Sequence, residues 1–217
     1  MDTATVKTRL PILSDTHGTD FNPAEKPLPR ADIDAPLKLA ISANHDFTLG
    51  DVAFRNKVAE ATPPLDLKLV EKEYGAIEGA RRLWEDAKDI GIILLDEGTH
   101  HFTLQNGAHL TVYASPYTPS LGACGFQYHP DRGHNFAIQE GVDVVITHGP
   151  PKGIMDYTHG RERAGCADLF AALFAAVAQA RPRVHCFGHI HEGWGAWLVT
   201  WRVYARRPTD SFHRDRK

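Results

Sequence analysis

Residues 142–151, VDVVITHGPP, decide the class of fold. The run from Val142 to Thr147 has consecutive apolar residues at 144–146, which predicts a strand covered on both faces, and His148 follows where it ends. Residues 184–187 have the same character and lead into Gly188-His189-Ile190-His191. Buried strands that deliver histidines at their ends indicate a metal site at the edge of a sheet.

Two shorter apolar runs near the start of the chain end in the same way. Leu10–Leu13 leads into Ser14-Asp15-Thr16-His17, and Leu37–Ser42 leads into Ala43-Asn44-His45-Asp46. Both runs are predicted to be strands that enter polar loops. Four histidine-bearing stretches therefore follow predicted strands, in a fixed order along the chain.

The remaining elements complete an alternation of strands and helices. Ile92–Leu95 is another predicted strand, and the Asn-Gly turn at residues 105–108 predicts a hairpin between residues 102–104 and 109–113. Apolar residues at three- and four-residue spacing predict a helix from Cys166 to Ala180. A second helix is expected from Ile77 to Lys88, with Leu83 and Trp84 facing the core. Strands alternating with helices predict an α/β fold.

The segment from Gly18 to Pro36 interrupts this alternation. Its prolines exclude both a helix interior and a central strand, so the segment should be loop. Parallel neighbours need a crossover of a dozen or more residues, usually helical, and here only this loop joins the first two strands. We therefore expect one strand-helix unit to be lacking near residues 30–36. Residues 1–204 should form a single domain, and residues 205–217 a polar, disordered tail.

Composition limits the class of protein. A chain of 217 residues with 42% apolar content can bury one substantial core. The formal charge of -3, with scattered Lys and Arg, provides no basic stripe, so nucleic acid is not an expected partner. Three cysteines without a Cys-x-x-Cys pair fit reduced thiols. Since no signal peptide or long apolar span is present, we expect a cytoplasmic protein without a membrane partner.

The histidine-bearing stretches contain donors that suit metal ions. Asp15 and His17 are separated by one residue, so both can point the same way from an extended backbone. The amide oxygen of Asn44 can ligate a hard or borderline ion. His189 and His191, again separated by one residue, can reach adjacent ions, and Gly188 leaves room for them.

Each stretch also has a plainer interpretation. Asp15 could cap a turn beside a surface histidine. Asn44-His45-Asp46 could be a turn followed by a helix cap. His148 could be a structural histidine at a strand end, and the histidines at 189 and 191 could be buried and bonded to backbone carbonyls. The coincidence of all four stretches at strand ends favours the metal site.

Together these stretches resemble the metal-binding motifs of the calcineurin-like metallophosphoesterase superfamily. Further segments resemble the branch that contains the brain-type metallophosphoesterase-domain proteins: 94–98, 115–119, 135–137, 146–151 and 187–195. The resemblance covers Leu10 to Val203. It implies an α/β/β/α sandwich of mixed sheets, with metal ligands on loops at the carboxyl ends of strands.

The resemblance also implies roles for individual residues. Asp15, His17 and His191 would hold a first metal ion, and Asn44, His148 and His189 a second. His45 would act as the acid near the leaving group, supported by Asp46. Mixed nitrogen and oxygen ligands suit Mn, Fe, Zn or Co. Two ions would neutralise phosphoryl oxygens and activate a hydroxide that attacks phosphorus.

The sequence departs from the family at one important motif. The family places Gly-Asp, whose carboxylate bridges both ions, between the first motif and Asn-His-Asp, but the only Gly-Asp is Gly50-Asp51, and we interpret Asp51 as a helix N-cap. Asp32 or Asp34 could substitute. Without a bridging carboxylate, repulsion between the ions favours one ion over two. Ala43, where relatives have Gly, would be strained if that turn needs a positive φ.

These observations predict a metal-dependent phosphoesterase that acts on small phosphomonoesters or phosphodiesters. The alternatives are an inactive relative that serves as a binding module and a truncated gene product with a lost segment near residue 34. Tyr117, Arg161, Arg163 and Trp194 are candidates for lining the substrate pocket, with packing or solvent exposure as the competing role. The physiological substrate and the oligomeric state are not encoded in these patterns.

Overall fold

The structure is a computed structural model, which describes residues 9–12, 35–122, 124–179 and 182–200. Several predicted features lie outside the described residues. They are Asp15, His17, most of the junction near residues 30–36 and the tail at 205–217.

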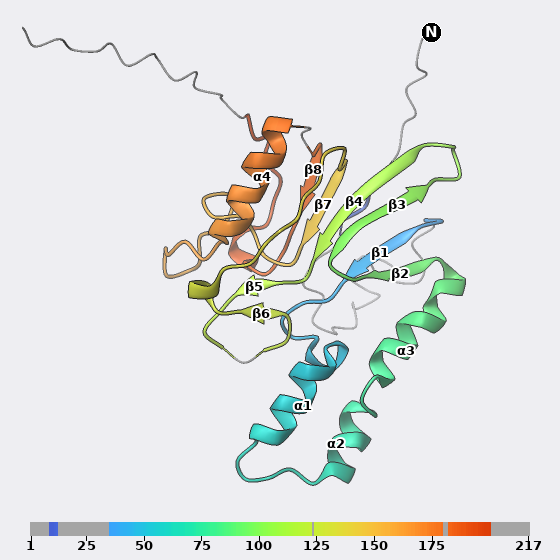
Figure 1. Ribbon diagram of the computed structural model, residues 1–217, viewed down its shortest axis with the longest axis vertical. Helices are drawn as coiled ribbons and strands as arrows, with labels where there is room; N and C mark the ends of the chain where they lie inside the picture. The colour runs from blue at the N-terminus through green and yellow to red at the C-terminus, as the bar shows by residue number, and fades with distance from the viewer. Residues whose placement is uncertain (1–8, 13–34, 123, 180–181, 201–217) are drawn as a thin grey trace, which may run out of the picture.

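A mixed four-stranded sheet forms the centre of the molecule (Figure 1). Its strand order is β3-β4-β7-β8, where β3 is Gly98–Thr103, β4 is His109–Ser115, β7 is Val144–Thr147 and β8 is Val184–Cys186. Strands β3 and β4 form the predicted antiparallel hairpin, with Gly107 at φ 80° in its turn. The β4–β7 and β7–β8 pairs are parallel, so β7 and β8 end at the same edge.

A second, parallel sheet pairs β1 (Lys38–Ile41) with β2 (Ile92–Leu95). Strand β2 has the bounds that the sequence predicted. Leu95 packs with Val112, Ala114 and Val144, which lie on one face of the four-stranded sheet. This cluster fills the space between the two sheets. The alternation along β4 explains the arrangement, because Val112 and Ala114 face this cluster while Tyr113 faces the opposite side.

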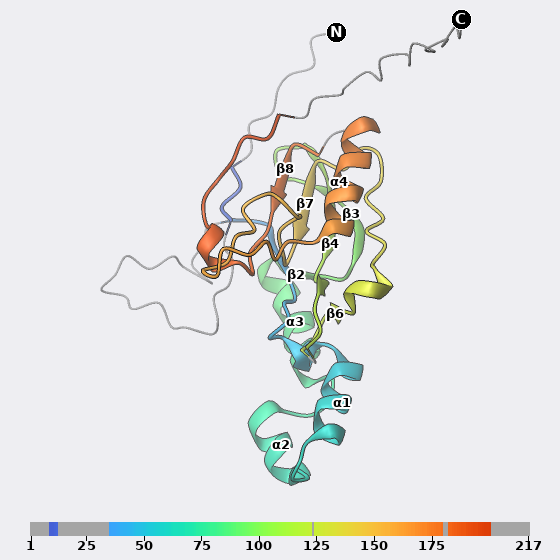
Figure 2. The same cartoon turned by 90° about the vertical axis from the view of Figure 1, so that its left-hand side faces the viewer.

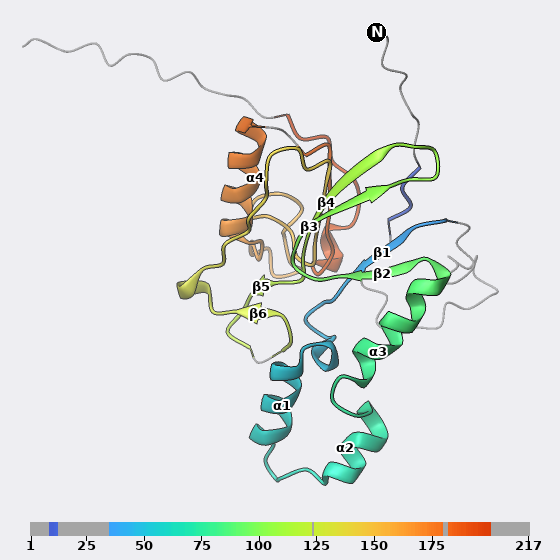
Figure 3. The ribbon, with the colours of Figure 1, turned by 45° about the vertical axis from the view of Figure 1, so that its right-hand side comes forward.

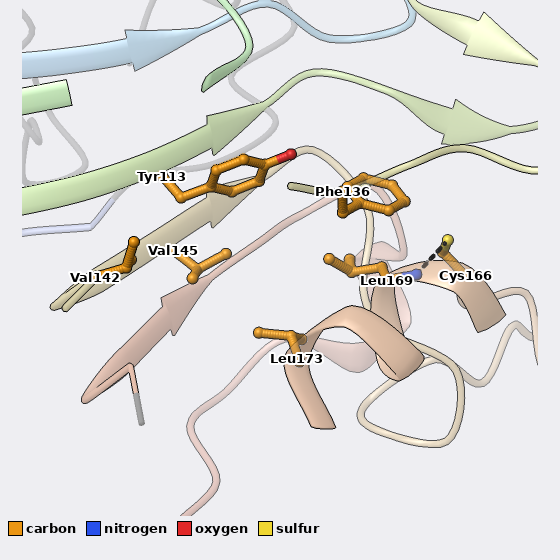
Figure 4. Close-up of a cluster of buried hydrophobic side chains, with 7 residues drawn as sticks. All are labelled: Tyr113, Phe136, Val142, Val145, Cys166, Leu169 and Leu173. Carbon is orange, nitrogen blue, oxygen red and sulfur yellow. Dashed lines mark hydrogen bonds between the residues drawn. The ribbon is translucent and has the colours of Figure 1, made fainter. Parts of the chain in front are cut away.

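Helix α4 (Ala167–Gln179) covers the other face of the four-stranded sheet. Leu169 and Leu173 pack with Tyr113 and Val145 in the core that Figure 4 shows. Phe170 is 37% exposed, so the buried stripe is narrower than the spacing of apolar residues predicts. The order of layers is helix, sheet and sheet. The α/β fold with a mixed sheet is confirmed.

Three helices form an arm that extends away from the sheets (Figures 1 and 2). They are α1 (Asp51–Glu60), α2 (Leu67–Tyr74) and α3 (Gly79–Asp86). The rings of Phe47, Phe54 and Tyr74, with centroids 5.7–6.3 Å apart, pack α1 against the end of α2. A bidentate contact from Arg81 to Asp96, at 2.7 and 3.3 Å, joins α3 to the end of β2.

Two short strands complete the fold. Strands β5 (Thr118–Pro119) and β6 (Gln127–Tyr128) pair in parallel and lie between the four-stranded sheet and α1 (Figure 3). Single 3-10 turns occupy residues 47–49, 87–90, 130–132 and 191–193. Within the part of the chain that the structure describes, no helix is long and apolar enough to cross a membrane.

Three expectations about local structure are wrong. Residues 10–12 of the predicted first strand form no strand, and Leu10 and Ile12 are 46% and 55% exposed, because Pro11 between them cannot donate to a ladder. Leu83 is 71% exposed, since α3 projects from the body and lacks a layer on that side. Gly50 rather than Asp51 is the N-cap of α1.

Candidate metal centre

Three of the predicted donors meet at one point. The Nε2 atom of His148 lies 2.7 Å from Oδ1 of Asn44, and the rings of His148 and His189 have centroids 4.7 Å apart at an interplanar angle of 63°. These residues follow β1, β7 and β8, so segments more than 100 residues apart in sequence converge here. Asn44 and His148 are buried, each with 7% exposure.

The turn after β1 fixes Asn44. The carboxylate of Asp46 accepts a hydrogen bond from the backbone N–H of Ala43 at 2.8 Å, and the carbonyl oxygen of Asn44 accepts one from Gly125 at 3.0 Å. A Cβ on Gly125 would lie 2.8 Å from the Cα of Phe47, so this approach requires glycine. Ala43 is not among the described residues with positive φ, and the strain considered for its methyl group does not arise.

The backbone on both sides of His148 is also fixed. Its N–H donates to the carbonyl oxygen of Ser115 at 3.2 Å, and its own carbonyl oxygen accepts from Gly188 at 2.9 Å. Gly149 follows, where a Cβ would lie 2.9 Å from Cγ2 of Thr118. The loop therefore joins β4, β7 and β8 at the edge where the strands end.

His189 has an unusual backbone conformation for a residue with a side chain. Its φ is 71°, in the left-handed region, which costs about 1–2 kcal/mol for an L-residue other than glycine. Such outliers cluster at ligand and active sites, because the surrounding structure must hold them in place. In this conformation the ring of His189 lies 4.7 Å from that of His148.

The other predicted site residues are placed differently. His191 is exposed and begins the 3-10 turn at residues 191–193. His45 is exposed as well, whereas Asp46 is half-buried. The role of Asp46 in supporting His45 stays a prediction, because the Asp46 carboxylate accepts its hydrogen bond from the backbone N–H of Ala43. Asp15 and His17 lie outside the described residues.

The converging donors fit a borderline divalent ion. The Asn44 and His148 atoms are 2.7 Å apart, a hydrogen-bond distance, and two donors at about 2.1 Å from one ion would lie about 3 Å apart or slightly more, so a small movement would admit an ion. Within the described ranges, no three His, Cys, Asp or Glu side chains gather as a metal site. The set here is one amide and two imidazoles, all neutral donors, which suit Mn, Fe, Co or Zn better than Mg.

Two polar clusters near the site escaped sequence reasoning. In the first, Glu97 Oε1 accepts hydrogen bonds from Ser115 Oγ at 2.7 Å and from the Tyr113 hydroxyl at 3.4 Å, and lies 2.7 Å from His134 Nε2. Burial is the main cause of the raised pKa of Tyr113, and the Glu97 carboxylate raises it further. The ring of Tyr117 lies 4.8 Å from that of His134, so Tyr117 packs against this cluster.

In the second cluster, Asp156 is fully buried and its Oδ1 accepts from Arg163 Nη1 at 2.7 Å. The guanidinium of Arg163 also lies 4.2 Å from the ring centroid of Tyr157. Arg163 is thus a structural partner of a buried carboxylate. Arg161 and Trp194 are exposed, the latter at 89%, and their part in substrate binding stays a prediction. No sequence motif marks Asp156, because a single Asp in a loop has many ordinary roles.

The chain is similar to several known proteins, although no family model matches it. It is 32% identical over 166 residues to a UPF0046 protein of Caenorhabditis elegans, covering 73% of this chain and 39% of that protein. It is 36% identical over 138 residues to the probable rhamnogalacturonate lyase C of Emericella nidulans, covering 63% of this chain and 12% of that protein.

A third relative is named for a metallophosphoesterase domain. Metallophosphoesterase domain-containing protein 1 of Homo sapiens is 41% identical over 90 residues, 39% of this chain and 26% of that protein. The chain therefore spans well under half the length of each of these relatives. These similarities, together with the α/β fold, support placing the chain in the calcineurin-like metallophosphoesterase branch.

Proposed function

We propose that this chain is a metal-dependent phosphoesterase that hydrolyses small phosphomonoesters or phosphodiesters. The observation that carries the proposal is the convergence of Asn44, His148 and His189, with an Asn44 Oδ1 to His148 Nε2 distance of 2.7 Å. The similarity to a metallophosphoesterase domain-containing protein supports the same reaction class.

The residues of the chain divide the work in this proposal. Asn44, His148 and His189 hold one divalent ion, Mn, Fe, Co or Zn, and Asp15, His17 and His191 are the donors for a second. A bound ion lowers the pKa of a water molecule and neutralises charge on phosphoryl oxygens. His45, which is exposed beside Asn44, donates a proton to the departing alkoxide. Asp46 holds the turn that presents His45.

A second candidate is an impaired relative that binds one ion or a partner. It is favoured by the sequence between His17 and Asn44, which lacks the Gly-Asp motif whose carboxylate bridges two ions in the family. A truncated gene product would have the same defect. Both alternatives predict slow or absent turnover on a retained scaffold.

Hydrolysis of bis-p-nitrophenyl phosphate and p-nitrophenyl phosphate by the full chain, after chelation and addition of Mn²⁺, tests the proposal. We expect metal-dependent turnover, and Asn44→Ala should lower kcat/KM by about 100-fold or more, because supporting groups alone cost 10–100-fold. Asn56→Ala, an exposed residue of α1, is the matched control and should keep full activity.

The metal content of the same samples separates the two candidates. Bound metal with turnover that His45→Ala abolishes supports the enzyme. One bound ion with equal, background hydrolysis by the wild type and Asn44→Ala supports the impaired relative and refutes the phosphoesterase.

A further inference from the structure

A short chain of hydrogen bonds connects β8 to the loop that carries His148. The Nε2 atom of His185 lies 2.8 Å from Oγ1 of Thr147, and that hydroxyl donates to the carbonyl oxygen of Gly149 at 2.8 Å. A hydroxyl has one proton, and Thr147 directs it to Gly149. His185 must therefore be the donor, which fixes its Nε2–H tautomer.

These hydrogen bonds involve the residues on both sides of the predicted metal ligand His148. Thr147 and Gly149 are the residues on either side of His148, and Thr147 is only 2% exposed. Strand β8 pairs with β7 so that His185 lies opposite Val145, and Thr147, two residues further along, is the last residue of β7. The contact between His185 and Thr147 therefore joins the two strands at the point where both enter their histidine-bearing loops.

The state of His185 suits a fixed donor. Burial lowers the pKa of its imidazole to about 3, so the ring stays neutral over the ordinary pH range. Its ring also packs against that of Phe187, with centroids 4.8 Å apart. The contacts of His185 with Thr147 and Phe187 involve none of the predicted metal donors.

We propose that His185 is a positioning residue, which acts through Thr147 and Gly149 to hold the His148 loop so that its imidazole faces Asn44 and His189. The structural part of this inference concerns the loop alone, and its consequence for metal binding rests on the proposed function. Groups that support a metal ligand in this way change metal affinity by about 10–100-fold when they are removed.

Two substitutions of His185 by amide side chains distinguish a residue that donates a hydrogen bond to Thr147 from one that only fills the space. His185→Gln places an amide N–H near the original Nε2 position, whereas the shorter His185→Asn cannot reach Thr147. Thr147→Val breaks the same chain from the other side with little change in volume. Leu173→Ala, in the core beneath α4, is the control for a general loss of stability.

The first measurement is amide hydrogen exchange in the metal-free protein. The informative amides are His148, which donates to Ser115, and Gly188, which donates to His148. We expect both to exchange about tenfold faster or more in His185→Asn and Thr147→Val, as in a locally opened segment. His185→Gln should resemble the wild type, and Leu173→Ala should show no selective change at these two amides.

The second measurement is Co²⁺ titration followed by visible absorption. His185→Asn and Thr147→Val should bind Co²⁺ about 10–100-fold more weakly, with His185→Gln and Leu173→Ala close to the wild type. Unchanged exchange in His185→Asn and Thr147→Val, or equal effects of Gln and Asn, would overturn the positioning role. If the exchange differences occur but the wild type binds no Co²⁺, the positioning role stands and the proposed metal site is refuted.

Discussion

The carboxylate of Asp156 provides the sharpest test of how the loop after His148 is held. It is fully buried, and its Oδ1 accepts from Arg163 at 2.7 Å. Its Oδ2 accepts from the backbone N–H groups of Gly153 at 2.8 Å and Gly165 at 3.3 Å. One side chain thus closes the loop between the two glycines.

Asp156→Ala should destabilise the protein by about 2–4 kcal/mol, because Asp156 is fully buried while the Arg163 side chain is 40% exposed and stays partly solvated. The magnitude has two sources. The charge-assisted hydrogen bond to the partly exposed Arg163 contributes about 1.5 kcal/mol, the lower end of its range, and the two backbone N–H groups left without an acceptor add about 1 kcal/mol each at most. Asp156→Asn keeps an acceptor but loses the charge, so its effect should be smaller.

Urea denaturation followed by tryptophan fluorescence measures these differences. Asp131→Ala is the control, since the Asp131 side chain is 92% exposed and its loss should change the unfolding free energy by less than about 0.5 kcal/mol. In a double-mutant cycle with Arg163→Ala, the combined loss should be clearly less than additive. A loss below about 1 kcal/mol for Asp156→Ala would show that this carboxylate does not hold the loop.

Three further changes have defined outcomes. The folded state lowers the pKa of His185 to about 3, so below about pH 6.5 the unfolded chain binds the proton first. Stability should fall by about 1–2 kcal/mol from pH 7 to pH 5, because the partly buried His185 stays neutral in the folded state, and His185→Gln should remove that part of the slope in urea titrations. Gly193→Ala should lower the unfolding free energy by about 1–3 kcal/mol, because its Cβ would meet the carbonyl oxygen of Met155, whereas thermal melts of Gly160→Ala should match the wild type. Thr118→Val should raise stability by about 1 kcal/mol in calorimetry, because the buried Thr118 hydroxyl finds no partner among the described residues, and a loss instead would show that the hydroxyl is satisfied.

The strands were predictable because a strand that is covered on both faces has apolar residues at consecutive positions. Consecutive apolar residues marked β2 at its observed bounds and located β7 and β8 to within two residues. The Asn-Gly turn marked the β3–β4 hairpin for the same reason, since few other dipeptides suit that geometry. That His148 and His189 lie side by side could be predicted because parallel strands end at one edge, while their binding of a metal stays a prediction.

In the arm of helices, α3 was predicted with bounds two residues too wide at each end, but α2 was not predicted. Helix α2 buries no residue although Leu67, Val70 and Tyr74 recur at helical spacing, and its marks are the Asp66 side chain that caps its start and Gly75 after its end. Leu83 was assigned to the core because a periodic pattern identifies a face without identifying what covers it. In the same way, nothing in the sequence distinguished Asp156 or His185 from ordinary loop and strand residues.

Charge decides how many ions the site can hold. Asn44, His148 and His189 are neutral donors, so one dication bound there keeps its full charge and attracts a phosphate ester. Two dications at about 4 Å and an effective dielectric of about 20 would repel each other by roughly 16 kcal/mol, four times the value for unit charges. Neutral ligands cannot offset a repulsion of this size. A second ion therefore requires a carboxylate, and those between His17 and Asn44, together with Asp15, are the sequence's candidate sources.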